Sequence, residues 1–527
     1  MVSLAAEVAN AHGSGRSFDH LNDVLVNGLR TYSDRILLKA AGGEDYSGAE
    51  MEGQVARYAA VFDQLGITLG VPVGLLAGNS VEVLFVQQAL GIIGGVFTPF
   101  HPMGTPSDFA YILNDSAIDI VVVDETRAPE IAKAIELAGR STRILTIGGG
   151  GDDDIVAMAA REQANRIELR QIDPEAIVRI IYTGGTTGVP KATQVSYRCM
   201  STMFGIIASD WEWPDEIRQL LVAPLSHSGG IVFTPTMARG GTLYVEPGFD
   251  VARTLAAIER HRITCMLMVP TMISAILDHP RLAEFDTSSI ETIFYGASPI
   301  TPARLRAGIA HFGPVFFQFY GQAEAPTTVT TMRRAEHDLS SDQRLASCGR
   351  PVPEAAVRLL DADGNEVPDG EPGELCVQGP LLMSGYLNKP AETAEALRGG
   401  WLHTGDVAIR DPDGFLRLVD RAKDMVITGG FNVYPRAVED VLEAHPGVAS
   451  ACVFGVPDDH WGEIVVAAVV LRDDATAIAD LVAHVRERKG PVQTPKRIEI
   501  VDAIPLTGVG KPDKKALRRT FAPPVHE

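Results

Sequence analysis

A loop rich in glycine and threonine carries the strongest chemical signal in the sequence. In IYTGGTTGVPKAT, a β-type run ends at Thr183 and the loop closes at Lys191. Glycines let backbone N–H groups approach anionic oxygens, threonine hydroxyls add donors, and a lysine supplies positive charge. The sequence therefore predicts a site for nucleotide phosphates, made by Thr183, Gly184, Gly185, Thr186, Thr187, Gly188 and Lys191.

This loop differs from the Walker phosphate loop. The Walker motif has glycine directly before its lysine, whereas Val189 and Pro190 precede Lys191 here. Taken alone, the segment is also explained by a glycine-rich surface turn. The motifs that follow favour the phosphate site.

Six further motifs occur in order along the chain. They are PLSHSGG (224–230), YGASPI (295–300), QFYGQAE (318–324), WLHTGD (401–406), DRAKDMVITGGFNVYP (420–435) and PLTGVGKPDKK (505–515). With the loop, they resemble the adenylate-forming superfamily, which includes acyl-CoA synthetases, adenylation domains of peptide synthetases and beetle luciferases. The resemblance implies ATP-dependent activation of a carboxylic acid to an acyl-adenylate with release of pyrophosphate, followed by transfer of the acyl group to coenzyme A with release of AMP.

The charged residues of these motifs have roles that the resemblance implies. Lys511 resembles the lysine that bridges the carboxylate and the α-phosphate, and Glu324 resembles the Mg²⁺ ligand. Asp406 resembles the acceptor for the ribose hydroxyls, and Arg421 resembles the arginine that holds ribose or phosphate. Because adenylation brings two anions together, positioning and charge neutralisation must supply most of the catalysis. Lys191, at the end of the loop, is predicted to be a further catalytic cation that binds the phosphates.

Other motif positions resemble the adenine slot and the acyl pocket. Tyr320 is similar to the aromatic residue that stacks on adenine, with a plain core tyrosine as the alternative, and Gln318 is similar to the polar partner of the exocyclic amine. His227 resembles a catalytic histidine near the reacting carboxylate, with a structural histidine as the alternative. The predicted nucleotide site also includes Gly296, Ala297, Ser298, Phe319, Gly321, Gln322 and Ala323. The predicted acyl pocket comprises His227, Ser228, Gly229, Phe319 and Gly321.

Three positions depart from the family pattern or bear on the acid. Ala323 stands where threonine is usual, which removes one hydrogen bond worth roughly 0.5–1.5 kcal/mol. Gly321 stands where acetate-activating relatives have tryptophan, which predicts a deeper pocket, whereas Phe319 replaces a small residue, which predicts a narrower or redirected one. Medium-chain, long-chain, alicyclic, steroid-derived and aromatic acids remain open.

The thioester step is predicted to use the C-terminal domain. The resemblance implies that this domain rotates after adenylation about Lys423, and that Gly429 and Gly430 then border the pantetheine channel. Trp461 is predicted to flank this channel, with a core tryptophan as the alternative.

A layered α/β scaffold is predicted to position these motifs. Alternating strands and helices indicate a large N-terminal AMP-binding domain over residues 1–420, with a β-rich subdomain at about 350–420. A small, mobile α+β C-terminal domain is predicted over 421–527, with the hinge near 421–424. Strands are expected at Ile177–Thr183, Cys265–Pro270, Thr292–Ala297 and Val315–Tyr320.

Composition limits the classes of partner. The formal charge of −21 and the pI of 5.1 argue against binding to nucleic acid or to an anionic membrane surface. The sequence shows no run of apolar residues long enough to cross a bilayer. The five cysteines lie far apart without a CxxC pair, which favours a cytoplasmic protein without a zinc site or disulfides. A homodimer remains open.

The sequence leaves three alternatives to a coenzyme A ligase. A separate carrier protein with a phosphopantetheine arm would accept the same acyl group, and luciferase-like oxygenation of an adenylate would require a special acid. Nucleotide binding without catalysis is disfavoured by the combined presence of Lys191, Glu324, Asp406, Arg421 and Lys511.

Overall fold

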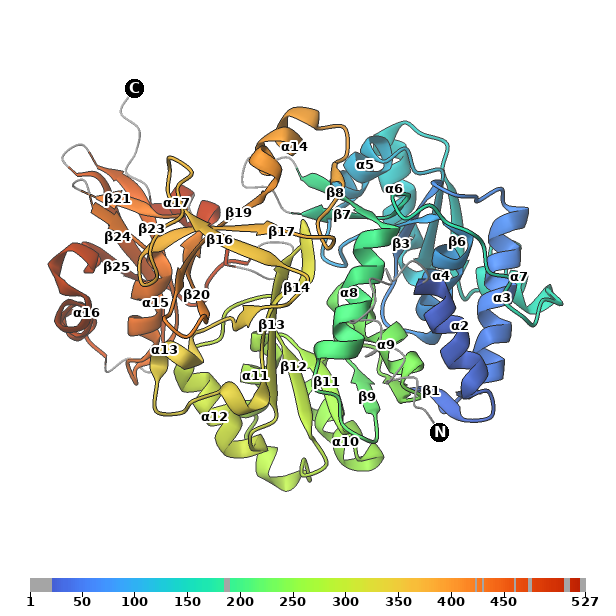
Figure 1. Cartoon of the computed structure of the whole chain (residues 1–527), viewed down its shortest axis with the longest axis horizontal. Coiled ribbons are helices and arrows are strands. Elements are labelled where there is room, and N and C mark those ends of the chain that lie inside the picture. The colour runs from blue at the N-terminus through green and yellow to red at the C-terminus, as the bar shows by residue number, and fades with distance from the viewer. Residues whose placement is uncertain are drawn as a thin grey trace.

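The computed structural model contains two large sheets and two small ones, with helices packed around them (Figure 1). It describes residues 21–183, 190–421, 424–428, 431–458, 461–472, 476–506 and 512–521. Elements of the C-terminal region lie at the left of Figure 1, and the blue N-terminal helices lie at the right. The predicted α/β class is confirmed.

The larger of the two main sheets has nine strands, of which the central ones are parallel. In spatial order they are β15 (Arg350–Pro351), β14 (Ala325–Met332), β13 (Phe316–Gln322), β12 (Thr292–Tyr295), β11 (Cys265–Met268), β9 (Arg218–Leu221), β10 (Thr242–Val245), β1 (Ile36–Ala40) and β2 (Asp45–Ser47). Strand β13 therefore brings the QFYGQAE motif into the sheet and delivers its last residues to the turn before β14.

The second main sheet has seven strands and carries the phosphate-loop motif. In spatial order they are β18 (Gly385–Tyr386), β8 (Lys191–Ser196), β7 (Ile177–Thr183), β4 (Val96–Pro99), β3 (Pro72–Leu76), β5 (Ile120–Asp124) and β6 (Arg143–Ile147). Strand β5 reads IVVVD and is buried over its first four residues, as is typical of a parallel strand covered on both faces. Strands β7 and β8 form an antiparallel pair, and the bounds of β7 agree with the prediction.

Two smaller sheets follow along the chain. The four-stranded sheet comprises β16 (Ala356–Leu360), β17 (Pro372–Gln378), β19 (Leu402–Arg410) and β20 (Leu416–Arg421). The five-stranded sheet comprises β22 (Phe431–Val433), β21 (Val426–Thr428), β24 (Gly462–Leu471), β23 (Val448–Asp458) and β25 (Arg497–Ile500). The predicted domain boundary at 421 falls between these two sheets, and the division itself stays a prediction.

Helices cover the sheets and begin or end at recognisable signals. Helix α4 starts after Ser80, whose hydroxyl accepts a hydrogen bond from the Val83 N–H, and it ends at Gly94 with φ of 78°. The helices of the N-terminal region are α2 (Leu21–Thr31), α3 (Gly48–Gln64), α4 (Val81–Ile93), α5 (Pro106–Asp115), α6 (Ala128–Ala138), α7 (Ile155–Arg161), α8 (Tyr197–Asp210), α9 (Phe233–Ala238), α10 (Val251–His261), α11 (Pro270–Leu277), α12 (Pro302–Phe312), α13 (Asp342–Leu345) and α14 (Pro390–Ala396). Those of the C-terminal region are α15 (Pro435–Glu443), α16 (Ile478–Gln493) and α17 (Lys514–Phe521).

The largest apolar core joins the two main sheets. It includes Val73 and Leu75 from β3 with Leu221 and Val245 from β9 and β10, together with side chains of α3, α4 and α8. Because both sheets bury apolar side chains in one cluster, their edges are held in a constant relation to each other. A separate apolar cluster lies within the C-terminal region and includes Val453.

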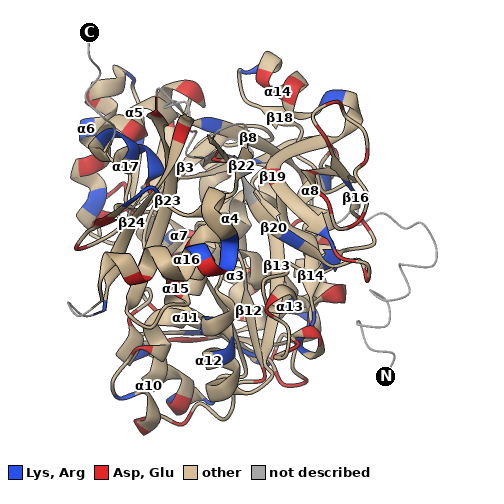
Figure 2. Cartoon of the chain, turned by 90° about the vertical axis from the view of Figure 1, so that its left-hand side faces the viewer, with Lys and Arg blue, Asp and Glu red and all other residues tan. Residues whose placement is uncertain are grey.

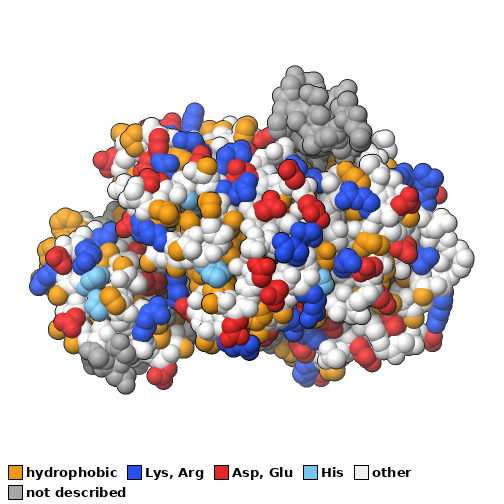
Figure 3. Space-filling model, turned by 90° about the horizontal axis from the view of Figure 1, so that it is seen from below, with side chains coloured by type: hydrophobic (Ala, Val, Ile, Leu, Met, Phe, Trp, Pro, Cys, Tyr) orange, Lys and Arg blue, Asp and Glu red, His pale blue; other side chains and the backbone are white. Residues whose placement is uncertain are grey.

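Charged residues lie mainly on the outer helices and loops (Figure 2). Acidic and basic side chains are interspersed over the face seen in Figure 3. In the part of the chain that the structure describes, every helix is too short or too polar to cross a lipid bilayer.

Candidate active site

The phosphate-loop motif connects two paired strands of the seven-stranded sheet. Thr183 ends β7 and is the cross-strand partner of Lys191, the first residue of β8. The predicted phosphate ligands between them, Gly184, Gly185, Thr186, Thr187 and Gly188, lie outside the described residues. The position of Lys191 is therefore the structural reference for this part of the site.

Tyr386, which is not among the predicted site residues, links Lys191 to Glu324. Its hydroxyl donates to Glu324 Oε1 at 2.8 Å, and the Lys191 ammonium lies 4.9 Å from the centre of its ring. Burial and the Glu324 carboxylate raise the pKa of Tyr386, so its hydroxyl stays a donor. In the sequence, only the short SGYLNKP segment between a strand and a proline-initiated helix marks this tyrosine, and such a segment has no chemical signature of its own.

A second tyrosine joins the nine-stranded sheet to the four-stranded sheet. The Tyr320 hydroxyl donates to Asp406 Oδ2 at 2.6 Å, and both residues are buried, with 9% and 6% exposure. Burial, more than the adjoining carboxylate, raises the pKa of Tyr320 well above its ordinary value. Asp406 is also the cross-strand partner of Arg421 in the pair of β19 and β20. Three residues predicted for the nucleotide site therefore lie together, although they are far apart in sequence.

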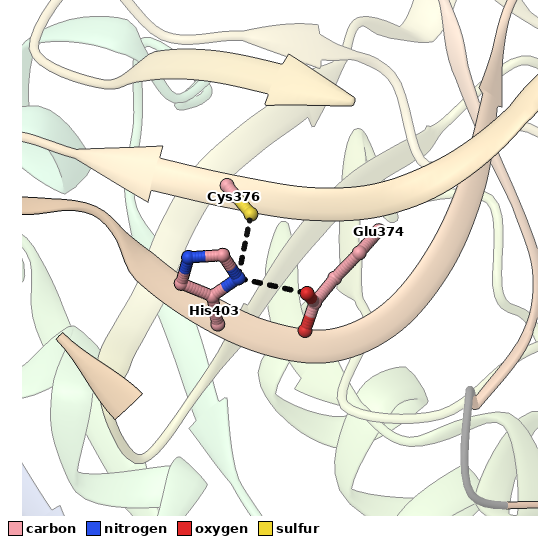
Figure 4. A group of neighbouring side chains, drawn as sticks. All are labelled: Glu374, Cys376 and His403. Carbon is pink, nitrogen blue, oxygen red and sulfur yellow. Dashed lines mark hydrogen bonds and ion pairs between the residues drawn. The ribbon is translucent and has the colours of Figure 1, made fainter. Parts of the chain in front are cut away.

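The turn before Asp406 is held by a polar cluster on β17 and β19 (Figure 4). His403 Nδ1 lies 2.8 Å from Glu374 Oε2 and 3.3 Å from Cys376 Sγ, and Glu374 Oε1 accepts from the Gly405 N–H at 3.1 Å. The Arg398 guanidinium also contacts Glu374, at 3.2 Å. Glutamate, cysteine and histidine are metal-ligand types, but hydrogen bonds and an arginine already engage these atoms, so the cluster is best explained as support for the turn.

A cavity of about 440 Å³ opens beside these groups. Its lining includes Lys191, Tyr386, His403, Thr404 and Gly405. The predicted phosphate lysine, its tyrosine neighbour and the turn that leads to Asp406 therefore face one space. This space lies where strands of the seven-stranded and four-stranded sheets meet.

Three residues of the predicted nucleotide site, Gly296, Ala297 and Ser298, lie in a strained turn after β12. Gly296 is closely packed, because a Cβ there would lie 2.3 Å from the Phe319 carbonyl oxygen. Ala297 has φ of 65°, a conformation that non-glycine residues rarely adopt. Such strain is frequent at functional sites, which agrees with the predicted role of this turn. Ser298 follows and is partly buried.

Two other predicted site residues point into the protein interior. The Gln318 side-chain oxygen accepts a hydrogen bond from the Tyr295 hydroxyl at 3.1 Å, which gives the side chain a structural partner. Phe319 is 4% exposed and stacks on Trp211 with ring centres 4.9 Å apart. The Phe319 ring therefore belongs to the aromatic core behind Gly296, and the predicted effect on the acyl pocket stays a prediction.

Gly321 has a local explanation that the sequence did not reveal. A Cβ at this position would lie 2.4 Å from the Thr327 nitrogen and 2.6 Å from the Ala325 carbonyl oxygen. The turn between β13 and β14 thus requires glycine, whatever the depth of the acyl pocket. Gln322 reaches across to the Thr404 carbonyl at 3.5 Å, and Ala323 is partly buried beside it.

His227 lies in a tight loop after β9. Its Nδ1 atom is 2.9 Å from the Ser226 hydroxyl, and the His101 ring meets its ring edge-on at 5.2 Å. Burial, His101 and Arg179 together lower the pKa of His227 to about 3, so the imidazole is neutral at physiological pH. The neighbouring Ser228 and Gly229 complete the loop, and a Cβ at Gly229 would lie 2.3 Å from the Ala223 carbonyl oxygen.

The remaining predicted residues belong to the C-terminal region. Lys423, Gly429, Gly430 and Lys511 lie outside the described residues. Trp461 is 43% exposed, and the Lys496 ammonium lies 5.3 Å from the centre of its ring. The alternative that Trp461 is a core residue is therefore wrong, and the predicted channel role stays a prediction.

Comparison with known proteins agrees with this arrangement. A model of the AMP-binding enzyme family matches residues 27–387, and a model of the AMP-binding enzyme C-terminal domain matches residues 437–511. The chain belongs to the AMP-binding enzyme family. The predicted resemblance to adenylate-forming enzymes is confirmed.

Individual relatives of this AMP-binding enzyme share nearly its whole length. The medium/long-chain-fatty-acid–CoA ligase FadD8 of Mycobacterium tuberculosis is 44% identical over 522 residues, which cover 96% of this chain and 91% of the relative. Feruloyl-CoA synthase of an Amycolatopsis species is 36% identical over 484 residues, which cover 91% and 95%. The structure of the amide bond synthetase McbA from Marinactinospora thermotolerans has a TM-score of 0.87 and 32% identity, and covers 96% of this chain and 100% of that one. The protein is an AMP-forming acid–CoA ligase that works through an acyl-adenylate made from ATP.

Proposed function

We propose that this acid–CoA ligase activates medium- to long-chain fatty acids. The 44% identity to a medium/long-chain-fatty-acid–CoA ligase carries this proposal, because that relative matches nearly the whole chain. An aromatic acid is the second candidate, favoured by the 36% identity to feruloyl-CoA synthase. Either acid would place the protein in lipid or aromatic-acid metabolism.

The roles of the site residues form the mechanistic part of the proposal. Asp406 accepts the ribose hydroxyls, Lys191 neutralises the phosphates, and Lys511 bridges the carboxylate and the α-phosphate. Support comes from the described groups, since Tyr320–Asp406 and Lys191–Tyr386–Glu324 lie around strands from three sheets. Neutral His227 would serve as a hydrogen-bonding group near the acid rather than as a cation.

Glu324 fits a Mg²⁺ ligand. Its carboxylate is partly buried, Oε1 accepts a hydrogen bond from the Tyr386 hydroxyl, and carboxylate oxygens are ligands that a hard cation prefers. When bound there, Mg²⁺ would neutralise phosphate charge beside Lys191. The residues of the chain then hold the triphosphate in place for attack by the carboxylate.

An assay of pyrophosphate release over a panel of acids tests the substrate. We expect ATP- and acid-dependent release, with kcat/KM highest for a saturated acid of medium or long chain. Lys511→Ala should lower the adenylation rate by more than about 100-fold, as expected for loss of a cation from the reacting centre. Lys515→Ala is the matched control in the same motif. A higher kcat/KM for ferulate-like acids than for every fatty acid would overturn the fatty-acid proposal.

A second assay identifies the acceptor of the acyl group. We expect AMP release and thioester formation on addition of coenzyme A. A carrier protein with a phosphopantetheine arm and a simple amine are tested in parallel, the latter because a relative of similar fold is an amide bond synthetase. Acyl transfer to coenzyme A slower than to the carrier protein or the amine would contradict the preferred acceptor.

The proposed location is the cytoplasm. All five cysteines are buried free thiols, which agrees with a reducing compartment. The channel roles of Gly429, Gly430 and Trp461, the hinge at Lys423 and a homodimer remain predictions.

A further inference from the structure

The side chain of Tyr386 spans the two charges on which the proposed nucleotide site depends. Its ring faces the Lys191 ammonium at 4.9 Å, and its hydroxyl donates to Glu324 Oε1 at 2.8 Å. An aromatic ring and its phenolic oxygen form one rigid plane. The Tyr386 side chain therefore contacts both the Lys191 ammonium and the Glu324 carboxylate, and its rigidity limits how far apart they can lie.

The backbone on both sides of Tyr386 is tied to the same two elements. Strand β18 pairs with β8, since Ser384 N–H donates to the Gln194 carbonyl and Leu387 N–H donates to the Ala192 carbonyl, at 2.9 and 2.8 Å. The Met383 N–H donates to the Glu324 carbonyl at 2.9 Å. The segment around Tyr386 thus connects the strand that begins at Lys191 to the turn that holds Glu324.

The start of helix α14 fixes the tyrosine from a third side. The Tyr386 N–H donates to the Thr393 hydroxyl at 2.9 Å. Gly385 has φ of 147°, and a Cβ there would lie 2.8 Å from Thr393 Cγ2. Glycine at 385 therefore allows the close approach that brings Tyr386 to this position.

The chemistry of the tyrosine suits both of its contacts. A hydroxyl that donates to a carboxylate occupies one acceptor direction on Oε1, which leaves Oε2 for a cation. The face of the ring attracts the Lys191 ammonium and so helps to fix its position. Both effects prepare the site before nucleotide binds.

We propose that Tyr386 is a positioning residue for adenylation, which sets the spacing between Lys191 and Glu324 and thereby the affinity of the enzyme for Mg²⁺–ATP. The proposal rests on the proposed function of Lys191 as a phosphate ligand and Glu324 as a metal ligand.

Two substitutions separate the two contacts of Tyr386. Tyr386→Phe keeps the ring and removes the hydroxyl, and it should raise the Mg²⁺ concentration for half-maximal pyrophosphate release about 3- to 30-fold. Tyr386→Leu removes both contacts and should also raise the KM for ATP by a further factor of about 2 to 10. The KM for the acid should stay within about twofold in both variants, because neither contact concerns the acid.

Tyr46→Phe is the matched control. Tyr46 also donates to a carboxylate, that of Glu44, at 2.7 Å, but it lies on β2 at the far edge of the nine-stranded sheet. This substitution removes the same kind of hydrogen bond and should leave the Mg²⁺ dependence unchanged. Equal Mg²⁺ dependence in Tyr386→Phe and in Tyr46→Phe would overturn the proposal.

Direct binding provides a readout that does not need turnover. Mn²⁺ replaces Mg²⁺ in a titration followed by electron paramagnetic resonance in the presence of ATP. We expect Tyr386→Phe to weaken Mn²⁺–ATP binding in the wild-type background but to have less than a twofold effect in the Glu324→Gln background, since the hydroxyl acts through that carboxylate. Equal effects in both backgrounds would mean that Tyr386 acts on the fold as a whole. If the wild-type protein releases no pyrophosphate with any acid but binds Mn²⁺–ATP with this coupling, the proposed substrate fails while the role of Tyr386 stands.

Discussion

Two tyrosine–carboxylate pairs connect the sheets of this enzyme, and their surroundings differ. Tyr320 and Asp406 are both buried, and Tyr320 packs in the apolar cluster between the nine-stranded and four-stranded sheets. Tyr386 and Glu324 are partly buried, and Tyr386 lines a cavity that Lys191 also lines. The same hydrogen bond therefore occurs once in a closed interior and once beside an open, charged space.

The difference indicates what each pair contributes. In the closed pair, removal of one partner breaks a buried hydrogen bond that water cannot readily replace, so stability and activity should fall together. In the open pair, water can replace a lost partner, so the fold should tolerate substitution while binding of a charged ligand changes. The following predictions test this division.

The largest effect is expected for Asp406→Asn. The substitution removes the charge that would accept the ribose hydroxyls and weakens the bond from Tyr320, so kcat/KM for ATP should fall about 30- to 300-fold. Steady-state kinetics measure this change. Asp369→Asn, at an exposed carboxylate beside the same sheet, is the control. A fall of less than about threefold would remove Asp406 from the nucleotide site.

Tyr320→Phe should reduce stability more than Tyr386→Phe. It removes the Tyr320 hydroxyl from the buried Asp406 oxygen, which should cost about 1–3 kcal/mol in the free energy of unfolding. Denaturant unfolding of both variants measures the difference. The Mg²⁺ dependence of Tyr320→Phe should match that of the wild type. A reversed order of stabilities would contradict the contrast between closed and open pairs.

Acid destabilisation is expected from His227, a buried group outside both pairs. Its pKa is lowered to about 3, below the ordinary value of 6.5, so the unfolded chain binds a proton that the folded chain excludes. Stability from this group is complete above pH 6.5 and decreases as the pH falls toward 3. We expect the wild type to lose about 1–2 kcal/mol more than His227→Gln between pH 8 and pH 5 in denaturant unfolding. Parallel losses would show that His227 is not responsible.

Alkaline destabilisation is expected from the two tyrosines. Their pKa values are raised above the ordinary value of 10.0, so above pH 10 the unfolded chain releases protons that the folded chain retains. Their contribution is complete below pH 10 and is lost as the pH rises. The wild type should therefore lose stability between about pH 9 and pH 11 more steeply than a Tyr320→Phe, Tyr386→Phe double variant. An equal decrease of stability with pH in the wild type and the double variant would show that other groups cause the loss.

The smallest effect is expected for Tyr46→Phe. The hydrogen bond from Tyr46 to Glu44 is exposed, and water replaces an exposed partner at little cost. The free energy of unfolding should change by less than about 0.5 kcal/mol. A larger loss of unfolding free energy would mean that the exposure of a tyrosine–carboxylate pair does not determine how much its hydrogen bond contributes to stability.

Short motifs predict many residues of the candidate site. The roles of Glu324 and Asp406 stay predictions from the motifs that contain them, whereas the predicted bounds of β7 are confirmed. These predictions rest on local chemistry, because the carboxylates and glycines occur at fixed places in one segment. The same approach did not identify Tyr386, because its partners are 62 and 195 residues away along the chain. Their proximity depends on the pairing of β18 with β8.

Some residues of the predicted site have neighbours that their motifs do not predict. Gln318 contacts Tyr295 on the adjacent strand, and Phe319 stacks on Trp211. Trp461 is exposed, although a core position explained the sequence equally well. Residue type alone does not determine these outcomes, because the same aromatic or amide side chain suits a site or a core.

The sequence by itself determined the enzyme family and the α/β class and predicted the groups for adenylation, because these follow from residue types and their spacing within short segments. Only the tertiary structure decided which charges share a space and which tyrosine holds them, because strands from different sheets supply the partners. Residues that are far apart in the sequence can be in contact in the folded chain, so their separation along the chain does not predict these contacts. The position of Tyr386 between Lys191 and Glu324 is the clearest case.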